Sequence, residues 1–168
     1  MTATTATIGD TSAAGRPGLV REYELRNMAT GRPTVVSIFS GLPETAGYEV
    51  IEEWAGPAAG EAPGAANLMV FDGPISPVAR GAHERAWTGR LQPVFAQLPG
   101  TIGTVGLWDA ERRSMAVLVL TTSLDAMEAL GKAVFSTQLL PDEDPTLLPG
   151  PDRADIHLVT NVHIGAAS

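Results

Sequence analysis

The 168-residue chain contains no cysteine, so disulfide bonds and thiolate metal sites are excluded. Basic residues are scarce: eleven Lys and Arg accompany nineteen Asp and Glu, which gives a formal net charge of −8. Because this excess repels phosphate, neither nucleic acid nor an anionic membrane surface is expected as a partner. No apolar run approaches the roughly 20 residues that span a membrane, and the N-terminal stretch does not resemble a signal peptide. We therefore expect a cytoplasmic protein.

What the chain does contain is ordinary for one globular domain, with 44% hydrophobic and 18% charged residues. Residues 1–18 are small and polar without periodicity, which predicts a disordered tail. Residues 19–66 predict an N-terminal extension of strands, a short helix and a linker. Residues 67–165 carry the clearest pattern and predict the main domain.

The N-terminal extension begins with two expected strands. Residues Val20–Leu25 alternate loosely, and residues Thr34–Phe39 are rich in β-branched side chains. In the next segment the spacing of Val50, Ile51 and Trp54 favours a short helix over a strand.

The main domain alternates strands with two helices. Ser76 followed by Pro77 is typical of a helix start, and this helix should run to about Leu98 with a kink at Pro93. Ser123 should cap the second helix. Strands are expected at 67–73, 101–108, 114–122 and 155–165. This β-α-β-β-α-β order predicts an α+β fold of the ferredoxin-like type, an antiparallel four-stranded sheet with two helices on one face.

The other face of this sheet needs a cover, because residues 115–120 (MAVLVL) are apolar on both sides of their strand. In the last strand, alternation would turn Ile156, Leu158, Thr160, Val162 and Ile164 toward the helices, and His157, Val159, Asn161 and His163 away from them. The cover could be a second subunit, the N-terminal strands, or both.

The order of elements, with the stretches GRLQPVFAQLPGTIGTVGLWD and VLVLTTSLDAMEALGKA, resembles the dimeric α+β barrel superfamily of antibiotic-biosynthesis monooxygenase-like proteins over about residues 67–165. The stretch LLPDEDPTLLPGPDR is similar to one in actinobacterial proteins. The resemblance implies a homodimer in which two sheets, one from each subunit, close a barrel, with a pocket between the helices and the sheet of each subunit.

Three functions are compatible with this superfamily. The first is a small-molecule-binding protein that acts as a cofactor-independent monooxygenase-like enzyme on a small apolar or aromatic metabolite. The second is a non-catalytic ligand-binding or structural dimer, and the third is a haem-binding protein. The fold alone does not decide among them, and the sequence leaves open whether the chain is an enzyme.

The proline-rich acidic segment Leu139–Arg153 cannot join a sheet edge, since its prolines lack N–H donors and fix φ. We expect a stiff strap across a barrel end or the dimer seam. The alternative is an ordinary acidic surface loop.

Two residues of the first helix are candidate catalytic groups. His83 and Arg90 each lie four residues from apolar positions of the buried stripe. If both face a pocket, Arg90 can stabilise developing negative charge and His83 can move a proton. The structural alternatives are that His83 is a hydrogen-bonding residue at the helix–sheet edge and that Arg90 extends to the surface.

The candidate substrate-binding walls are Trp87, Trp108, Asn161 and His157. Trp87 could instead belong to the core, and Trp108 could pack at the barrel end. No cofactor motif is present, and His157 and His163 lie ~20 Å apart along one strand, so no metal site is expected. Haem would need a single histidine, for which His83 and His157 both qualify.

Overall fold

The computed structural model describes residues 4–41 and 47–166. In this part of the chain the strands are β1 (Thr4–Gly9), β2 (Leu19–Asn27), β3 (Pro33–Ser40), β4 (Tyr48–Ala55), β5 (Ala65–Phe71), β6 (Thr101–Asp109), β7 (Ser114–Thr121) and β8 (Arg153–Ile164). The helical segments are α1 (Pro77–Ala86), the π-helical turn η1 (Trp87–Leu91), α2 (Gln92–Phe95), α3 (Leu124–Ser136) and the 3-10 turn η2 (Pro145–Leu147). None of these helices is long and apolar enough to cross a membrane.

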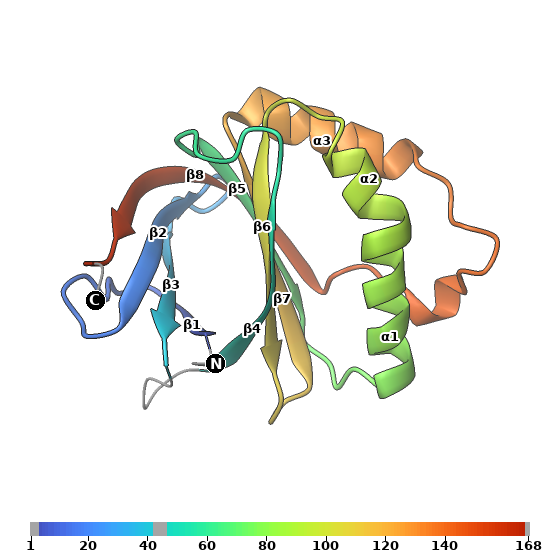
Figure 1. The fold of residues 1–168 in the computed structure, drawn as a ribbon, viewed down its shortest axis with the longest axis horizontal. Helices are drawn as coiled ribbons and strands as arrows, with labels where there is room; N and C mark the ends of the chain where they lie inside the picture. The colour runs from blue at the N-terminus through green and yellow to red at the C-terminus, as the bar shows by residue number, and fades with distance from the viewer. Residues whose placement is uncertain (1–3, 42–46, 167–168) are drawn as a thin grey trace.

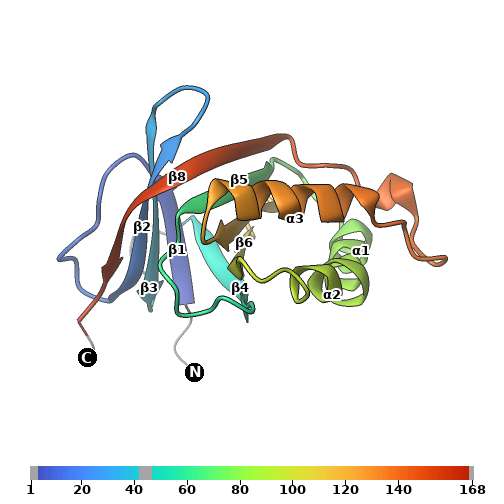
Figure 2. The same ribbon diagram turned by 90° about the horizontal axis from the view of Figure 1, so that it is seen from above.

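The strands form one closed antiparallel barrel in the order β1-β3-β2-β8-β5-β7-β6-β4 (Figure 1). The ferredoxin-like order of the main domain is confirmed, and its helices all lie on the outer side of the sheet (Figure 2). The N-terminal strands cover the other face, because β2 pairs with β8 and β1 pairs with β4. The barrel is therefore closed within one chain, where the resemblance implied two sheets from two subunits.

The expected tail at residues 1–18 contains a strand. Residues Thr4–Gly9 pair with Ser40–Val35 of β3, so this stretch is part of the barrel wall. The short polar side chains suggested disorder, but the backbone of β1 is held by β3 along its whole length. Residues 1–3 lie outside the described part of the chain.

The helix expected around Val50, Ile51 and Trp54 is wrong, because this segment is strand β4. The pairing of β4 with β6 shifts between Val50 and Glu52, which is the mark of a β-bulge. The bulge turns Val50 toward the barrel interior and Trp54 toward the helices. The apolar residues of β4 therefore do not alternate as in a regular strand, and their spacing resembles that of a helix. Residues 42–46 of the same segment lie outside the described part.

Two apolar layers follow from the closed barrel. Inside it lie side chains such as Leu25, Ile38 and Leu118, and a second layer between the sheet and the helices includes Val119 and Met127. Strand β7 contributes to both layers, which confirms that residues 115–120 are buried on both faces.

The last strand also carries a bulge, and the expected division of its faces is confirmed up to Val159 and wrong beyond it. The pairing of β8 with β2 skips Thr160, so that Val159 and Val162 both pack against the barrel core. Leu158 and Ile164 are exposed instead. His157 lies opposite Ala66, a barrel-core residue, and is itself buried.

The helix starts and the kink are confirmed. The hydroxyls of Ser76 and Ser123 accept hydrogen bonds from the backbone N–H groups of Ala79 and Ala126. At η1 the Gln92 N–H bonds to the carbonyl of Trp87, five residues back, immediately before Pro93. A π-turn at this place accommodates the missing N–H of the proline.

Glu22 on β2 fixes the loop that follows β1. Its carboxylate is fully buried and accepts hydrogen bonds from the Ser12 hydroxyl, the Ala13 N–H and the Ser37 hydroxyl. Burial alone would raise the pKa of Glu22, but these hydrogen bonds outweigh it, and the pKa lies below the usual 4.5.

Replacing Glu22 by Gln should therefore lower the free energy of unfolding by about 2 kcal/mol at neutral pH. The glutamine side chain has an NH₂ group in place of one carboxylate oxygen, and this donor would face the hydroxyl and N–H groups that now donate to Glu22. Because the folded-state pKa is lowered, the carboxylate stabilises the fold above the unfolded pKa and loses this effect as pH falls through the folded value. In urea unfolding, the difference in free energy of unfolding between the wild type and Glu22→Gln should become smaller below about pH 4.5. Glu24→Gln is the matched control, and an equal loss in both variants would contradict the role of Glu22.

Candidate functional site

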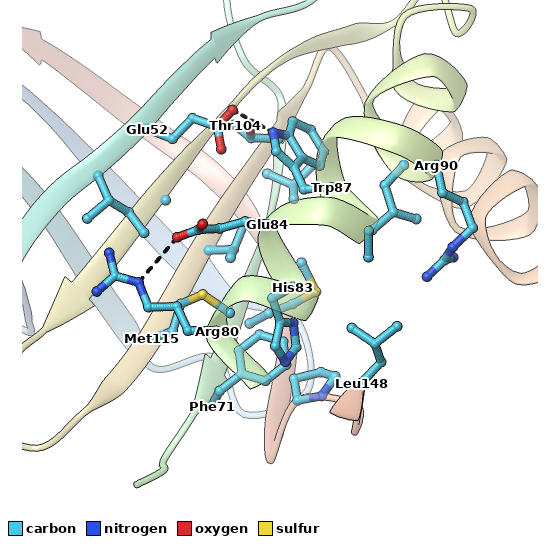
Figure 3. A pocket seen from close by; sticks show the side chains of 18 of the residues that line it. Glu52, Phe71, Arg80, His83, Glu84, Trp87, Arg90, Thr104, Met115 and Leu148 are labelled. Carbon is cyan, nitrogen blue, oxygen red and sulfur yellow. Dashed lines mark hydrogen bonds and ion pairs between the residues drawn. The ribbon is translucent and has the colours of Figure 1, made fainter. Parts of the chain in front are cut away.

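A cavity of about 270 Å³ lies between the helical segment α1–η1–α2 and the outer face of the sheet (Figure 3). The sheet contributes an apolar floor, formed mainly by Met69, Phe71, Met115, Val117 and Val119. The helical side contributes Arg80, His83, Glu84, Trp87, Arg90 and Leu91. His83, Trp87 and Arg90, all candidates from the sequence, are thus brought together at one pocket, which is hereafter called the helix–sheet pocket.

His83 faces this pocket from the middle of α1. It follows the buried Ala82, and its ring meets the ring of Phe71 edge-on, with centroids 5.1 Å apart. Burial lowers the pKa of His83 below the usual 6.5, because the apolar surroundings disfavour the imidazolium. The neutral imidazole can accept a proton from a ligand in the pocket.

Trp87 forms one end of the pocket with partners that the sequence did not reveal. Its indole N–H donates to Glu52 of β4 at 2.6 Å, and its ring lies edge-on to Trp54 and Phe95. Sequence reasoning missed Glu52 and Trp54 at this site because β4 was expected to be a helix. The alternating pattern that would have signalled a strand is broken by its bulge.

Arg90 is paired with an acidic residue of the proline-rich segment. Its Nε donates to both carboxylate oxygens of Glu143, at 3.1 and 2.8 Å, and the two side chains are only 12% and 6% exposed. Glu143 also accepts from the backbone N–H of Leu140. The positive charge of Arg90 is therefore neutralised before any ligand enters.

The proline-rich segment is a wall of the helix–sheet pocket. Leu148, Pro149 and Pro151 line the cavity, and the side chain of Leu140 lies against Gly89, where an added Cβ would come within 3.2 Å of it. The segment loops around the outer side of α1 in Figure 1. The expectation of a strap is thus met in part: it crosses the helix and the pocket, where a barrel end or dimer seam was expected.

Two further charged side chains of the pocket are paired with each other. Arg80 forms an ion pair with Glu84 at 3.3 Å, and its guanidinium lies 4.3 Å from the ring centre of Trp108. Trp108 is buried beneath Arg80 and does not line the cavity. Its neighbour Asp109 accepts hydrogen bonds from the N–H groups of Glu111 and Arg112 and so begins the turn.

Two expected wall residues lie elsewhere in the structure. His157 is sealed inside the barrel, where its Nδ1 lies 2.9 Å from the carbonyl oxygen of Asp155. Asn161 is exposed on the outside of β8 and contacts His163. The β8 bulge at Thr160 turns Asn161 to the outside, whereas His157 points away from the helices as expected but is enclosed by the closed barrel.

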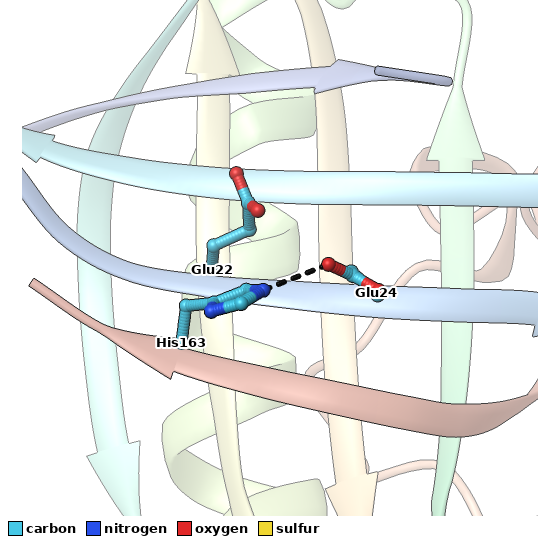
Figure 4. Close-up of side chains that lie close together, drawn as sticks. All are labelled: Glu22, Glu24 and His163. Carbon is cyan, nitrogen blue, oxygen red and sulfur yellow. Dashed lines mark hydrogen bonds and ion pairs between the residues drawn. The ribbon is translucent and has the colours of Figure 1, made fainter. Parts of the chain in front are cut away.

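A second group of polar side chains was also unforeseen, because it depends on the pairing of β2 with β8. Glu22, Glu24 and His163 lie together on the outside of the barrel, with ligand atoms within 4.8 Å of one another (Figure 4). His163 Nε2 lies 2.8 Å from Glu24, and Glu22 is already engaged by three donors. These hydrogen bonds account for the proximity of the three side chains, so we interpret the group as structural.

No protein-family model and no curated protein matches this chain. Among solved structures, a ferredoxin-fold protein from Listeria monocytogenes related to antibiotic biosynthesis monooxygenases is 13% identical, with a TM-score of 0.59 over 96% of this chain and 95% of the other. A major regulator of staphylococcal pathogenesis is 10% identical, with a TM-score of 0.64 over 95% and 99%. A heme-degrading enzyme from Listeria monocytogenes is 13% identical, with a TM-score of 0.53 over 94% and 99%. These likenesses establish the fold, which proteins of different function share.

Removing the acidic partner of Arg90 should loosen the strap. Glu143→Gln leaves a largely buried guanidinium without its counter-charge and should lower the free energy of unfolding by about 3 kcal/mol. Hydrogen exchange of residues 137–152 should become faster. Asp142→Asn, at the exposed neighbouring acid, is the control, and the apolar pair Arg90→Met with Glu143→Leu should recover most of the loss. If Glu143→Gln exchanges and unfolds like the wild type, the ion pair does not hold the strap.

Proposed function

We propose that the protein binds a small apolar or aromatic metabolite in the helix–sheet pocket and acts on it as a cofactor-independent monooxygenase-like enzyme. The observation that carries this proposal is the combination of an apolar cavity with one neutral imidazole facing it. The volume of about 270 Å³ suits a ligand of one or two rings. The aromatic rings of Phe71 and Trp87 offer edge and face contacts to such a ligand.

His83 is the proposed general base. A phenol or enol that gives its proton to the imidazole becomes an electron-rich anion, which dioxygen oxidises more readily. One oxygen atom would enter the product while the other leaves as water with two hydrogens of the substrate. Dioxygen is the oxidant in this scheme, so the chain itself has to supply only binding, orientation and a proton acceptor.

Arg90 has a different proposed role from the one suggested by the sequence. Because Glu143 already holds its Nε, Arg90 fixes the strap that closes the pocket and contributes little free positive charge. The Trp87 indole N–H is likewise held by Glu52, so the developing anion is balanced mainly by the imidazolium that forms when His83 takes the proton.

The residues of this pocket do not fit haem. Haem carries two carboxylates, whereas Arg90 is held by the largely buried Glu143, and Glu52 and Glu84 both add negative charge to the pocket wall. His157, the second histidine considered as an axial ligand, is sealed within the barrel. A non-catalytic binding protein remains the second candidate, since the same apolar pocket supports binding without chemistry.

The first test is binding of 2-naphthol, a fluorescent phenol of two rings. Gly106 lies on the pocket floor, and a Cβ there would meet its nearest neighbour at an ordinary 3.5 Å, so the larger side chain of Gly106→Leu should extend into the cavity and reduce its volume. Naphthol binding should be lost in this variant and kept in Gly131→Ala, a change on α3 with open space around it. Equal binding by Gly106→Leu and the wild type would place the ligand elsewhere.

The second test separates catalysis from binding by measuring oxygen uptake with a panel of phenols and anthrones. His83→Gln should bind naphthol within a few-fold of the wild type and lower the oxidation rate by about 100-fold. Since the pKa of His83 is lowered, the wild-type rate should stay constant down to about pH 6.5 and fall only at more acidic pH, where the imidazole gains a proton. Naphthol binding without oxygen uptake from any substrate of the panel would instead select the non-catalytic protein.

A further inference from the structure

A second cavity, of about 510 Å³, opens at the rim of the barrel, where the first residues of β2 and the last residue of β8 come near β4. Its apolar walls include Val20, Ile38, Val50 and Ile164. It is hereafter called the rim cavity. It is distinct from the helix–sheet pocket, and among the described residues the two share only Ile51 and Glu52 of β4.

Two β-bulges shape this rim. The pairing of β2 with β3 shifts between Leu19 and Arg21, and the pairing of β4 with β6 shifts between Val50 and Glu52. Bulges bend strands away from the regular barrel wall and re-aim side chains. The first one places Arg21 opposite Ile38, a residue of the barrel core, so the guanidinium is directed across the mouth of the barrel.

Arg21 is incompletely satisfied at this position. The structure records one hydrogen bond from its guanidinium, from Nη2 to Glu53 at 3.1 Å, although this group carries five N–H donors. Its Nε is buried and has no hydrogen-bond partner among the described residues. A ligand cannot reach this enclosed Nε, but Nη1 has no recorded partner in the same part of the chain and is not among the buried atoms, so an acceptor supplied by a ligand can reach it.

The existing contact with Glu53 does not prevent such a ligand from binding. The side chains of Arg21 and Glu53 are 32% and 45% exposed, and ion pairs of this kind contribute only about 0–1 kcal/mol. A carboxylate in the cavity can approach the Nη edge of the guanidinium, bind Nη1 and share Nη2 with Glu53 in charge-assisted hydrogen bonds. The aliphatic walls would then enclose an apolar tail attached to that carboxylate.

We propose that the rim cavity binds a monocarboxylate with an apolar tail, with its carboxylate held by Arg21 and the tail against Val20, Ile38 and Ile164. The inference is independent of the function proposed for the helix–sheet pocket. Glu53 acts as the resident counter-ion of Arg21 and competes with the incoming carboxylate. Glu52 also lines the rim cavity, but its carboxylate is engaged by the Trp87 indole N–H.

Octanoate tests the proposal, with 1-octanol and octylamine as matched ligands of the same tail length. Calorimetry should show octanoate binding more tightly than both. Arg21→Met should weaken octanoate binding at least about tenfold, because a charge-assisted hydrogen bond is lost. Glu53→Gln should strengthen it, because the competing carboxylate is removed, and this variant keeps the test valid if Arg21→Met fails to fold.

Amide chemical shifts locate the bound octanoate independently. The largest changes should fall at Val20 and Ile164, with smaller ones at Met115 and Leu148 of the helix–sheet pocket. The reverse pattern would place octanoate in the helix–sheet pocket and overturn the proposal. Weaker binding by Glu53→Gln, unchanged binding by Arg21→Met, or preference for octylamine would overturn it as well.

Discussion

The pairing of β2 with β8 is the constraint on which the rest of the structure depends. It joins the N-terminal strands to the ferredoxin-like unit and runs from Arg21–Ile164 to Asn27–His157. The second seam, between β1 and β4, is much shorter and contains the pairs Thr5–Glu49 and Ala6–Tyr48. Once the barrel is closed, its interior is filled by side chains, and the helices can cover only the outer face of the sheet. The helix–sheet pocket is therefore outside the barrel.

Parts of the chain that are distant in sequence meet at that pocket, and each contributes a different feature. The sheet supplies an apolar floor, α1 supplies a histidine kept neutral by burial, and the proline-rich strap supplies the outer wall. The strap can do this because its prolines keep it stiff and Glu143 ties it to Arg90. Strand β4 separates this pocket from the rim cavity, and its bulge gives the two sides different chemistry: Glu52 meets Trp87, whereas Glu53 meets Arg21.

Local patterns in the sequence predicted the parts of this arrangement that depend on near neighbours. Both serine caps, the two-faced strand at 115–120 and the position of His83 follow from spacing within one element. Patterns within one segment do not predict bulges, and one extra residue reverses the faces of the strand that follows it. For this reason the sequence did not predict strand β4 or the side-chain directions in the part of β8 beyond its bulge. The Arg90–Glu143 pair spans 53 residues, and no pattern within either segment links the two side chains.

Isotope-filtered NMR on an equal mixture of labelled and unlabelled chains tests single-chain closure most directly. The account predicts that cross-strand contacts between Tyr23 of β2 and Val162 of β8 arise only within a chain, so that they are missing from the intermolecular spectrum. Strong intermolecular contacts between these two strands would mean that the barrel is completed by a neighbouring chain, and would contradict the account.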